Sequence, residues 1–151
     1  LGKTLVRRFP CGTEFKAMIT ETEAYRGEED LACHACKGKT KRTKTMYEAG
    51  GVLYIYLVYG MHWMLNVVTG EKDMPQATLI RGIEHYEGPG KLTKYLGITK
   101  SLNGIKLEES TKIWIEESGL APAHDENPRI GIDYAGEIWK GKPWRYTIRN
   151  I

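Results

Sequence analysis

Apolar and polar residues alternate along several short segments of the chain, the pattern of β-strands that are half-buried in a sheet. It predicts strands at residues 3–8 and 14–25, joined by a turn at Pro10-Cys11-Gly12. Further strands are expected at residues 52–59, 63–69, 77–81, 113–116, 129–132 and 144–148. Gly60 separates the strand at residues 52–59 from that at 63–69, and Gly70 marks the turn before the strand at 77–81.

Helical signals are few and short. Residues 28–36 predict a helix whose first turn holds Glu28, Glu29 and Asp30, where negative charge complements the helix dipole. Residues 91–96 predict a helix of one or two turns behind Gly88-Pro89-Gly90. The chain shows no repeat and no linker. An α+β fold with an antiparallel or mixed sheet therefore fits the pattern best.

The composition indicates a soluble globular domain. The 151 residues are 41% hydrophobic and 27% charged, and no apolar run approaches the ~20 residues that span a bilayer. A net charge of +3 permits a nucleic-acid partner without requiring one. The three cysteines, Cys11, Cys33 and Cys36, predict free thiols in a reducing compartment. Cys33 and Cys36 have the spacing of half a zinc site, but the second half is missing, so no metal is expected.

Two glutamates share one face of the strand at residues 14–25. Alternation places Ala17, Ile19, Glu21, Glu23 and Tyr25 together on that face. A carboxylate beside a tyrosine in a low-dielectric cleft becomes more basic, and a spacing of roughly 7 Å would also suit a pair of glycosidase carboxylates. Alternatively, both glutamates lie on a sheet edge that is exposed to water.

A basic loop leads into a tyrosine-rich strand. The loop KGKTKRTK, residues 37–44, precedes Tyr54, Tyr56 and Tyr59, in a chain with nine tyrosines and only two phenylalanines. Basic side chains beside aromatic platforms are typical of proteins that bind unstacked bases. Tyrosine is also common in ordinary strands, so the pattern alone leaves both interpretations open.

Taken in order, the motifs resemble one family over nearly the entire chain. They are ITETEAY (19–25), His34, the basic loop, LYIYLVYGMHWMLNVV (53–68), ATLIRGIE (77–84), GPGKL (88–92) and RIGIDYAGEIWKGKPWRYTIR (129–149). This series resembles the alkyladenine (3-methyladenine) DNA glycosylases of the mammalian type. The resemblance implies one glycosylase domain over residues 1–151, with a curved sheet and a protruding β-hairpin.

The resemblance also implies an activity. Such a protein is a base-excision-repair enzyme that flips an alkylated or deaminated purine out of duplex DNA and hydrolyses its N-glycosidic bond, leaving an abasic site. It needs no metal and no cofactor. Its expected partner is double-stranded DNA with damaged purines, with no membrane and no second subunit. Its expected location is inside the cell with the DNA, in the cytoplasm and nucleoid or in a nucleus.

For catalysis, the resemblance assigns Glu23 as the general base that activates water against C1′ of the sugar. Arg81 helps to hold Glu23 and the water. Glu21 is expected to support the structure around them. Tyr59 matches the side chain that enters the minor groove and fills the space that the flipped base leaves.

For recognition, the resemblance assigns Tyr25, His34 and Tyr56 to the pocket that holds the flipped base. Their electron-rich rings favour a cationic alkylpurine. Asn66 matches the residue whose bulk rejects the exocyclic amino group of guanine. The expected contacts to the duplex are Thr40, Arg42, Met61, His62 and Lys91, the last at a helix N-terminus where phosphate is favoured.

Several departures from the family pattern keep other functions open. The loop after His34 is one residue shorter, Thr43 replaces an asparagine, and the segment 81–88 is trimmed. The family continues beyond TIRNI (147–151) into a Ser-Pro-Trp-Val-Ser-like tail that helps to position the water. A non-catalytic binder of damaged DNA with the same fold is therefore one alternative, although Glu23 favours catalysis. A zinc-dependent module built on Cys33, His34 and Cys36 is another.

Overall fold

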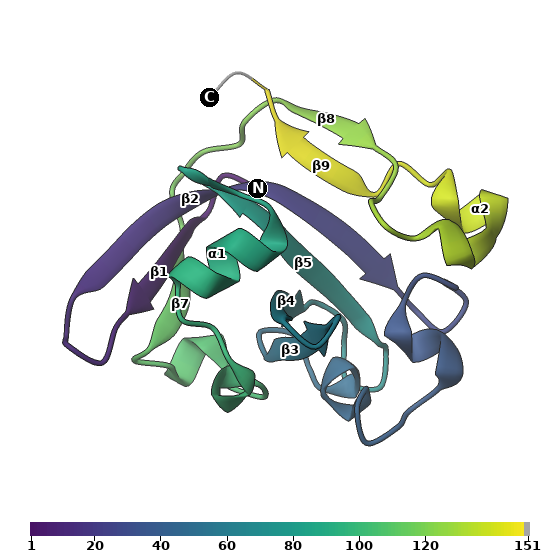
Figure 1. Ribbon diagram of the computed structural model, residues 1–151, viewed down its shortest axis with the longest axis horizontal. Helices are drawn as coiled ribbons and strands as arrows, with labels where there is room; N and C mark the ends of the chain where they lie inside the picture. Colours follow the sequence, from purple (N-terminus) through teal and green to yellow (C-terminus); the bar gives the residue numbers. More distant parts are fainter. Residues whose placement is uncertain (150–151) are drawn as a thin grey trace.

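The longest element of the protein is strand β2, Glu14–Arg26, and the rest of the sheet is arranged around it (Figure 1). The computed structural model describes residues 1–149. Its main sheet runs in the order β3-β4-β5-β2-β1-β7, and β6, β8 and β9 join it at the sides. The bounds are β1 Thr4–Arg8, β3 Leu53–Val58, β4 His62–Val68, β5 Gln76–Ile83, β6 Tyr86–Glu87, β7 Ile113–Glu116, β8 His124–Asn127 and β9 Arg145–Ile148.

Strand β2 belongs to both halves of the curled sheet. Its first half pairs with β1 and its second half with β9 on the same edge, while β5 pairs with the other edge. The pairing with β5 shifts register on both sides of Glu21, which is the signature of a β-bulge. Such a bulge bends a strand, and the main hydrophobic core fills the inside of the curl, around Leu65, Ile80 and Leu92.

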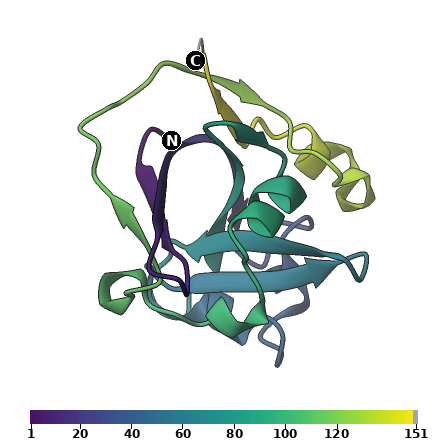
Figure 2. The same ribbon diagram turned by 60° about the vertical axis from the view of Figure 1, so that its left-hand side comes forward.

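A hairpin formed by β3 and β4 extends away from the curl (Figure 2). At its tip Tyr59 and Gly60 have φ angles of 52° and 66°, and the Met61 N–H donates to the Val58 carbonyl at 3.1 Å. Two consecutive positive φ angles make the tight turn whose twist suits a hairpin. The antiparallel pairing, the hairpin and the few short helices confirm the predicted α+β fold.

The helices are few and short, and α1 packs on the inside of the curled sheet. Helix α1, Pro89–Tyr95, is fixed to β4 because the Thr93 hydroxyl donates to the Trp63 carbonyl at 2.8 Å. Helix α2, Gly136–Lys140, precedes β9. None of the helices in residues 1–149 has the length and apolar character that a membrane crossing requires. The remaining turns are 3₁₀-helices: η1 His34–Lys37, η2 Lys44–Tyr47, η3 Lys100–Leu102, η4 Leu107–Glu109 and η5 Asp133–Ala135.

Two sequence predictions are wrong, and two strands, the two-residue β6 and β8, were missed. Residues 28–33 form turns rather than a helix, because Asp30 is buried and holds an arginine 99 residues away. Residues 129–132 form a loop rather than a strand. Strand β8, with the sequence HDEN, carries no apolar alternation and therefore gave no strand signal. The other predicted strands, and the helix at α1, are confirmed within a few residues at each end.

Candidate active site

A cavity of about 490 Å³ opens where β2, β3, β4 and β5 meet the loop at residues 130–134. Aromatic side chains form much of its wall, with one glutamate and two arginines. The cavity brings together eight of the twelve residues that the sequence assigned to a site: Glu23, Tyr25, His34, Arg42, Tyr56, Tyr59, Asn66 and Arg81.

Glu23 lies at the floor of this cavity and is fully buried, at 0% exposure. The Tyr25 hydroxyl donates to its Oε2 atom at 2.7 Å, and the backbone N–H of Ile130 donates to its Oε1 atom at 2.7 Å. The two donors come from opposite sides, one from β2 and one from the loop at residues 130–134. The carboxyl group is therefore held in one orientation, and the possibility that it faces bulk water is wrong.

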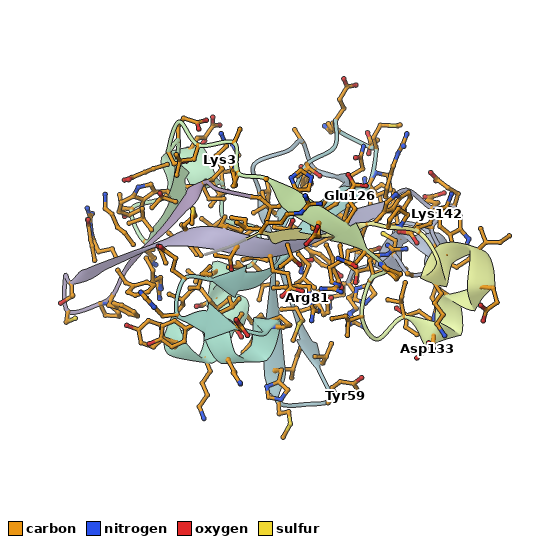
Figure 3. All side chains as sticks on the ribbon, turned by 90° about the horizontal axis from the view of Figure 1, so that it is seen from above. Lys3, Tyr59, Arg81, Glu126, Asp133 and Lys142 are labelled. Atoms are coloured by element: carbon orange, nitrogen blue, oxygen red, sulfur yellow. The ribbon has the colours of Figure 1, made fainter. Side chains whose placement is uncertain are left out.

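Arg81 on β5 brings positive charge to the same floor. Its Nε atom donates to Glu21 Oε1 at 3.1 Å and lies 3.6 Å from Glu23 Oε1. Arg145 on β9 also donates to Glu21, at 3.2 Å. Glu21 therefore anchors Arg81 in place beside Glu23. Figure 3 shows Arg81 in the middle of the molecule, set back from the exposed hairpin tip.

Burial keeps the rings of the cavity uncharged. Burial, with Arg42 and Lys37 nearby, lowers the pKa of His34 to about 4. Burial raises the pKa of Tyr54 to about 12 and also raises those of Tyr25 and Tyr56. The His34 ring centre lies 4.4 Å from that of Tyr56, and its Nδ1 is 2.9 Å from the Tyr54 hydroxyl. The neutral imidazole is thus fixed edge-on against a tyrosine.

Asn66 projects into the cavity from β4 and is 2% exposed. Its Nδ2 donates to the carbonyl oxygens of Tyr54 and Met64, at 3.1 Å and 3.4 Å. Both donor hydrogens are therefore engaged by backbone. The side chain cannot rotate away from an incoming group without losing these bonds.

The hairpin tip carries the most exposed aromatic ring at the cavity. Tyr59 is 91% exposed, and Figure 3 shows it at the end of the hairpin, far from the body of the sheet. Its positive φ is uncommon for a bulky residue and is a feature of functional turns. Met61 beside it is 68% exposed. The tip thus presents two apolar side chains to solvent.

Four predicted contact residues lie outside the cavity wall. Met61 and His62 are on the hairpin, and the His62 ring packs against Gly90, since a Cβ on that glycine would lie 2.9 Å from Nδ1. Lys91 is exposed on α1. Thr40 is engaged locally, because its N–H donates to the Thr43 hydroxyl at 2.8 Å.

Sequence reasoning missed three parts of the site. Ile130, whose N–H binds Glu23, lies in the segment that was predicted as a strand. Tyr134 lines the cavity and its hydroxyl donates to the Ala32 carbonyl at 3.2 Å. Asp30 and Arg129 form a buried ion pair behind Tyr25. The sequence contains no local signal for the last pair, because it joins distant segments.

The cysteines of the C-x-x-C spacing have different surroundings. Cys33 is buried, which raises the pKa of its thiol to about 12, and Cys36 is half-buried. Across residues 1–149, no group of three or more His, Cys, Asp or Glu side chains has the geometry to hold a metal ion.

A buried carboxylate with two hydrogen bonds therefore lies under a cavity whose walls are largely aromatic. The sequence matches the family profile described as methylpurine-DNA glycosylase (MPG), over residues 1–87 and 84–151. The chain therefore belongs to the methylpurine-DNA glycosylase family, and its role is that of a DNA glycosylase. The two matched pieces meet at residues 84–87, inside the segment that was predicted to be trimmed.

Curated relatives agree with the family match. Proteins named "Putative 3-methyladenine DNA glycosylase" from Psychrobacter cryohalolentis and Rickettsia rickettsii are each 44% identical to this chain. The first alignment covers 95% of this chain and 80% of the relative, and the second covers 100% and 81%. A protein of the same name from Methanocella arvoryzae is 42% identical, and the alignment covers 99% of this chain and 84% of the relative. The prediction about a tail beyond Ile151 concerns positions outside the described residues.

Proposed function

We propose that this protein is a monofunctional DNA glycosylase that removes alkylated or deaminated purines, 3-methyladenine among them, from double-stranded DNA. One observation carries the proposal: the only carboxylate on the cavity wall, among residues 1–149, is fully buried and held by two short hydrogen bonds. A protein that only binds DNA gains nothing from a negative charge placed next to phosphates, whereas a hydrolase needs a base at that point.

In the proposed reaction, Glu23 activates the attacking water. A carboxylate offers about four acceptor sites, and Tyr25 and Ile130 occupy two of them, so Glu23 keeps sites for a proton of water. As the water oxygen bonds to C1′ of the deoxyribose, its proton passes to Glu23 and the bond from C1′ to the base nitrogen breaks. A cationic alkylated base leaves as a neutral one, and an abasic site remains.

The same carboxylate stabilises the transition state. As the glycosidic bond breaks, positive charge develops on the sugar, as in other glycoside hydrolyses. Glu23 provides an opposite charge in a site of low dielectric, where the attraction is much stronger than in water. The Glu21–Arg81 contact holds a positive group 3.6 Å from Glu23.

The aromatic walls select the base. Tyr25, His34 and Tyr56 present uncharged rings that attract a flat cationic purine, by about 1–2 kcal/mol when desolvated. Asn66 occupies the space that the amino group of guanine would need. Tyr59 at the hairpin tip fills the gap in the duplex, and Arg42, Lys91 and neighbouring residues contact the DNA. The protein acts as one domain and one chain, where the cell keeps its DNA.

The proposal is tested by measuring abasic sites. Duplexes that contain 3-methyladenine, 7-methylguanine, hypoxanthine or ethenoadenine are incubated with the protein, and strand breaks are counted after alkaline treatment. We expect release of at least one of these bases, and a loss of at least about 100-fold for Glu23→Gln with duplex binding retained. Release of base by Glu23→Gln at the parental rate would remove Glu23 from the mechanism.

A matched control is available in the chain. Glu28 is exposed, and its Oε1 atom accepts a hydrogen bond from the Tyr47 hydroxyl at 2.6 Å, much as Glu23 does from Tyr25. Glu28→Gln makes the same chemical change at a tyrosine-bound carboxylate outside the cavity. We expect it to keep the parental rate. If neither the parent nor Glu28→Gln released any base while both bound damaged duplex, a non-catalytic binder would be the better description.

A further inference from the structure

A buried ion pair lies directly behind the candidate active site. Arg129 Nη1 donates to Asp30 Oδ2 at 2.6 Å and Nη2 donates to Oδ1 at 2.9 Å, and both side chains are 0% exposed. Asp30 also accepts from the N–H groups of Ala32 and Arg26, at 3.0 Å and 3.2 Å. Both acid oxygens are therefore fixed by the bidentate fork of the arginine and by backbone.

Stability alone is a poor explanation for this pair. Removing two charges from water costs several kcal/mol per ion, and well-packed apolar residues are often as stable or more so. The Arg129 Nε atom is buried and has no hydrogen-bond partner among residues 1–149, which adds a further cost. What the pair provides is geometry, because a guanidinium fork on a carboxylate fixes the position and plane of both groups.

The guanidinium also contacts two aromatic rings. Its central carbon lies 4.7 Å from the centre of the Tyr25 ring and 5.0 Å from that of Trp144. Its Nη1 atom donates to the carbonyl of Ala24 at 3.0 Å, the residue between Glu23 and Tyr25 on β2. Arg129 thus contacts both the backbone beside Glu23 and the ring whose hydroxyl binds Glu23.

The second donor to Glu23 comes from the residue that follows Arg129. The Ile130 N–H reaches Glu23 Oε1 at 2.7 Å, yet residues 128–132 lie between β8 and η5, outside any strand. No ladder of strand pairs sets the position of this N–H. The Ile130 side chain, 51% exposed, does not anchor it in the core either. Arg129 is the buried side chain next to this N–H, while Ile132, 3% exposed, anchors the segment two residues further on.

We propose that the Asp30–Arg129 pair is a positioning device for catalysis, which sets the two hydrogen-bond donors of Glu23 and so aims its carboxylate at the sugar. This inference rests on the proposed function. Asp30 and Arg129 do not touch the substrate, and as a neutral pair they add no net charge to the cavity. Their main effect passes through Glu23, so it falls on the bond-breaking step far more than on the binding and flipping of the base.

The test separates the rate of base release from binding. Arg129→Lys keeps the positive charge but loses the bidentate fork, and Asp30→Asn keeps the size of the acid but loses its charge. Single-turnover release is measured with enzyme in large excess over a damaged duplex, because the rate constant then does not depend on the folded fraction. Duplex affinity is measured by anisotropy, and flipping by the fluorescence of a base analogue.

We expect the rate constant to fall about 10- to 100-fold in both variants, as small errors of placement do in other enzymes, with affinity and flipping within about 3-fold of the parent. Arg7→Lys is the matched control. Arg7 is also a buried arginine, at 7% exposure, but it binds the backbone carbonyls of Leu96 and Lys112 far from the cavity. It should lower the melting temperature without changing the rate constant.

Two results would overturn the positioning role. One is a rate constant equal to that of the parent in either Arg129→Lys or Asp30→Asn, provided that circular dichroism shows the variant to be folded. The other is a loss of affinity and flipping in step with the loss of rate, which a merely structural role predicts. Failure of the proposed function is a different outcome, since the unmodified protein would then release no base at all.

Discussion

His34 should make the folded protein lose stability as the pH falls below neutral. Burial, helped by Arg42 and Lys37, lowers the pKa of His34 from 6.5 to about 4 in the folded state. The unfolded chain therefore binds a proton between these values that the folded protein does not. The contribution of neutral His34 to the stability of the folded protein is fully present above pH 6.5. It is lost as the pH falls from 6.5 to about 4.

The size of this effect follows from the shift. Stability changes by about 1.4 kcal/mol per pH unit inside the interval, so moving from about pH 7.5 to about pH 5 crosses about 1.5 units and costs about 2 kcal/mol. The ring is only partly buried, and solvent screening reduces the figure to about 1–2 kcal/mol. Protonation would also set a positive charge beside Tyr54 and Tyr56, in the cavity that is proposed to receive a cationic base.

Urea unfolding, followed by tryptophan fluorescence at both pH values, measures the effect against His34→Gln. Other groups titrate too, but they are common to both proteins and cancel in the difference. The free-energy gap between the parent and His34→Gln should shrink by about 1–2 kcal/mol at the lower pH. A constant gap for His34→Gln would refute the reasoning.

Two further predictions concern recognition. Tyr59→Ala should weaken trapping of the flipped base, measured by a fluorescent base analogue in the duplex. Met74→Ala is the control, because it removes an exposed apolar side chain in the turn between β4 and β5, and it should leave trapping unchanged. Equal flipping in the parent and in Tyr59→Ala would exclude the proposal that Tyr59 enters the duplex. Asn66→Ser should release guanine from undamaged duplex, because it opens the space beside the base, and should cost about 1 kcal/mol of stability, because the side-chain bonds to the Tyr54 and Met64 carbonyls are lost. If Asn66→Ser released no more guanine than the parent, the role of Asn66 in rejecting guanine would be wrong.

The parts of the site that follow local rules could be predicted from the sequence. The period of two along β2 placed Glu21, Glu23 and Tyr25 on one face, and the structure has Tyr25 bonded to Glu23 and both glutamates within 4 Å of Arg81. The Tyr59-Gly60 turn fell where a glycine interrupts two apolar strands. In each case a few neighbouring residues decide the geometry.

The missed parts depend on contacts between distant segments. Asp30 has the position of a helix N-terminal acid, yet its partner Arg129 is 99 residues away, and that bond replaces the helix with turns. Ile130 follows in an apolar alternation that predicts a strand. Its N–H is instead used by a side chain of β2, so no strand partner is left for it. Local propensity yields to tertiary contacts most readily where a chain builds a site.

The opposite pKa shifts of the cavity rings have a common cause, and together they limit what can titrate during catalysis. Burial disfavours the charged form of every ring, so it raises the pKa of Tyr25, Tyr54 and Tyr56 and lowers that of His34. No ring among these four changes charge between about pH 5 and pH 11 in the folded protein. A dependence of base release on pH within that range then has a source other than these four rings, such as the DNA or the leaving base. Measuring the profile with a cationic and with a neutral damaged base separates the last source from the others, because only the neutral base gains from a proton as it leaves.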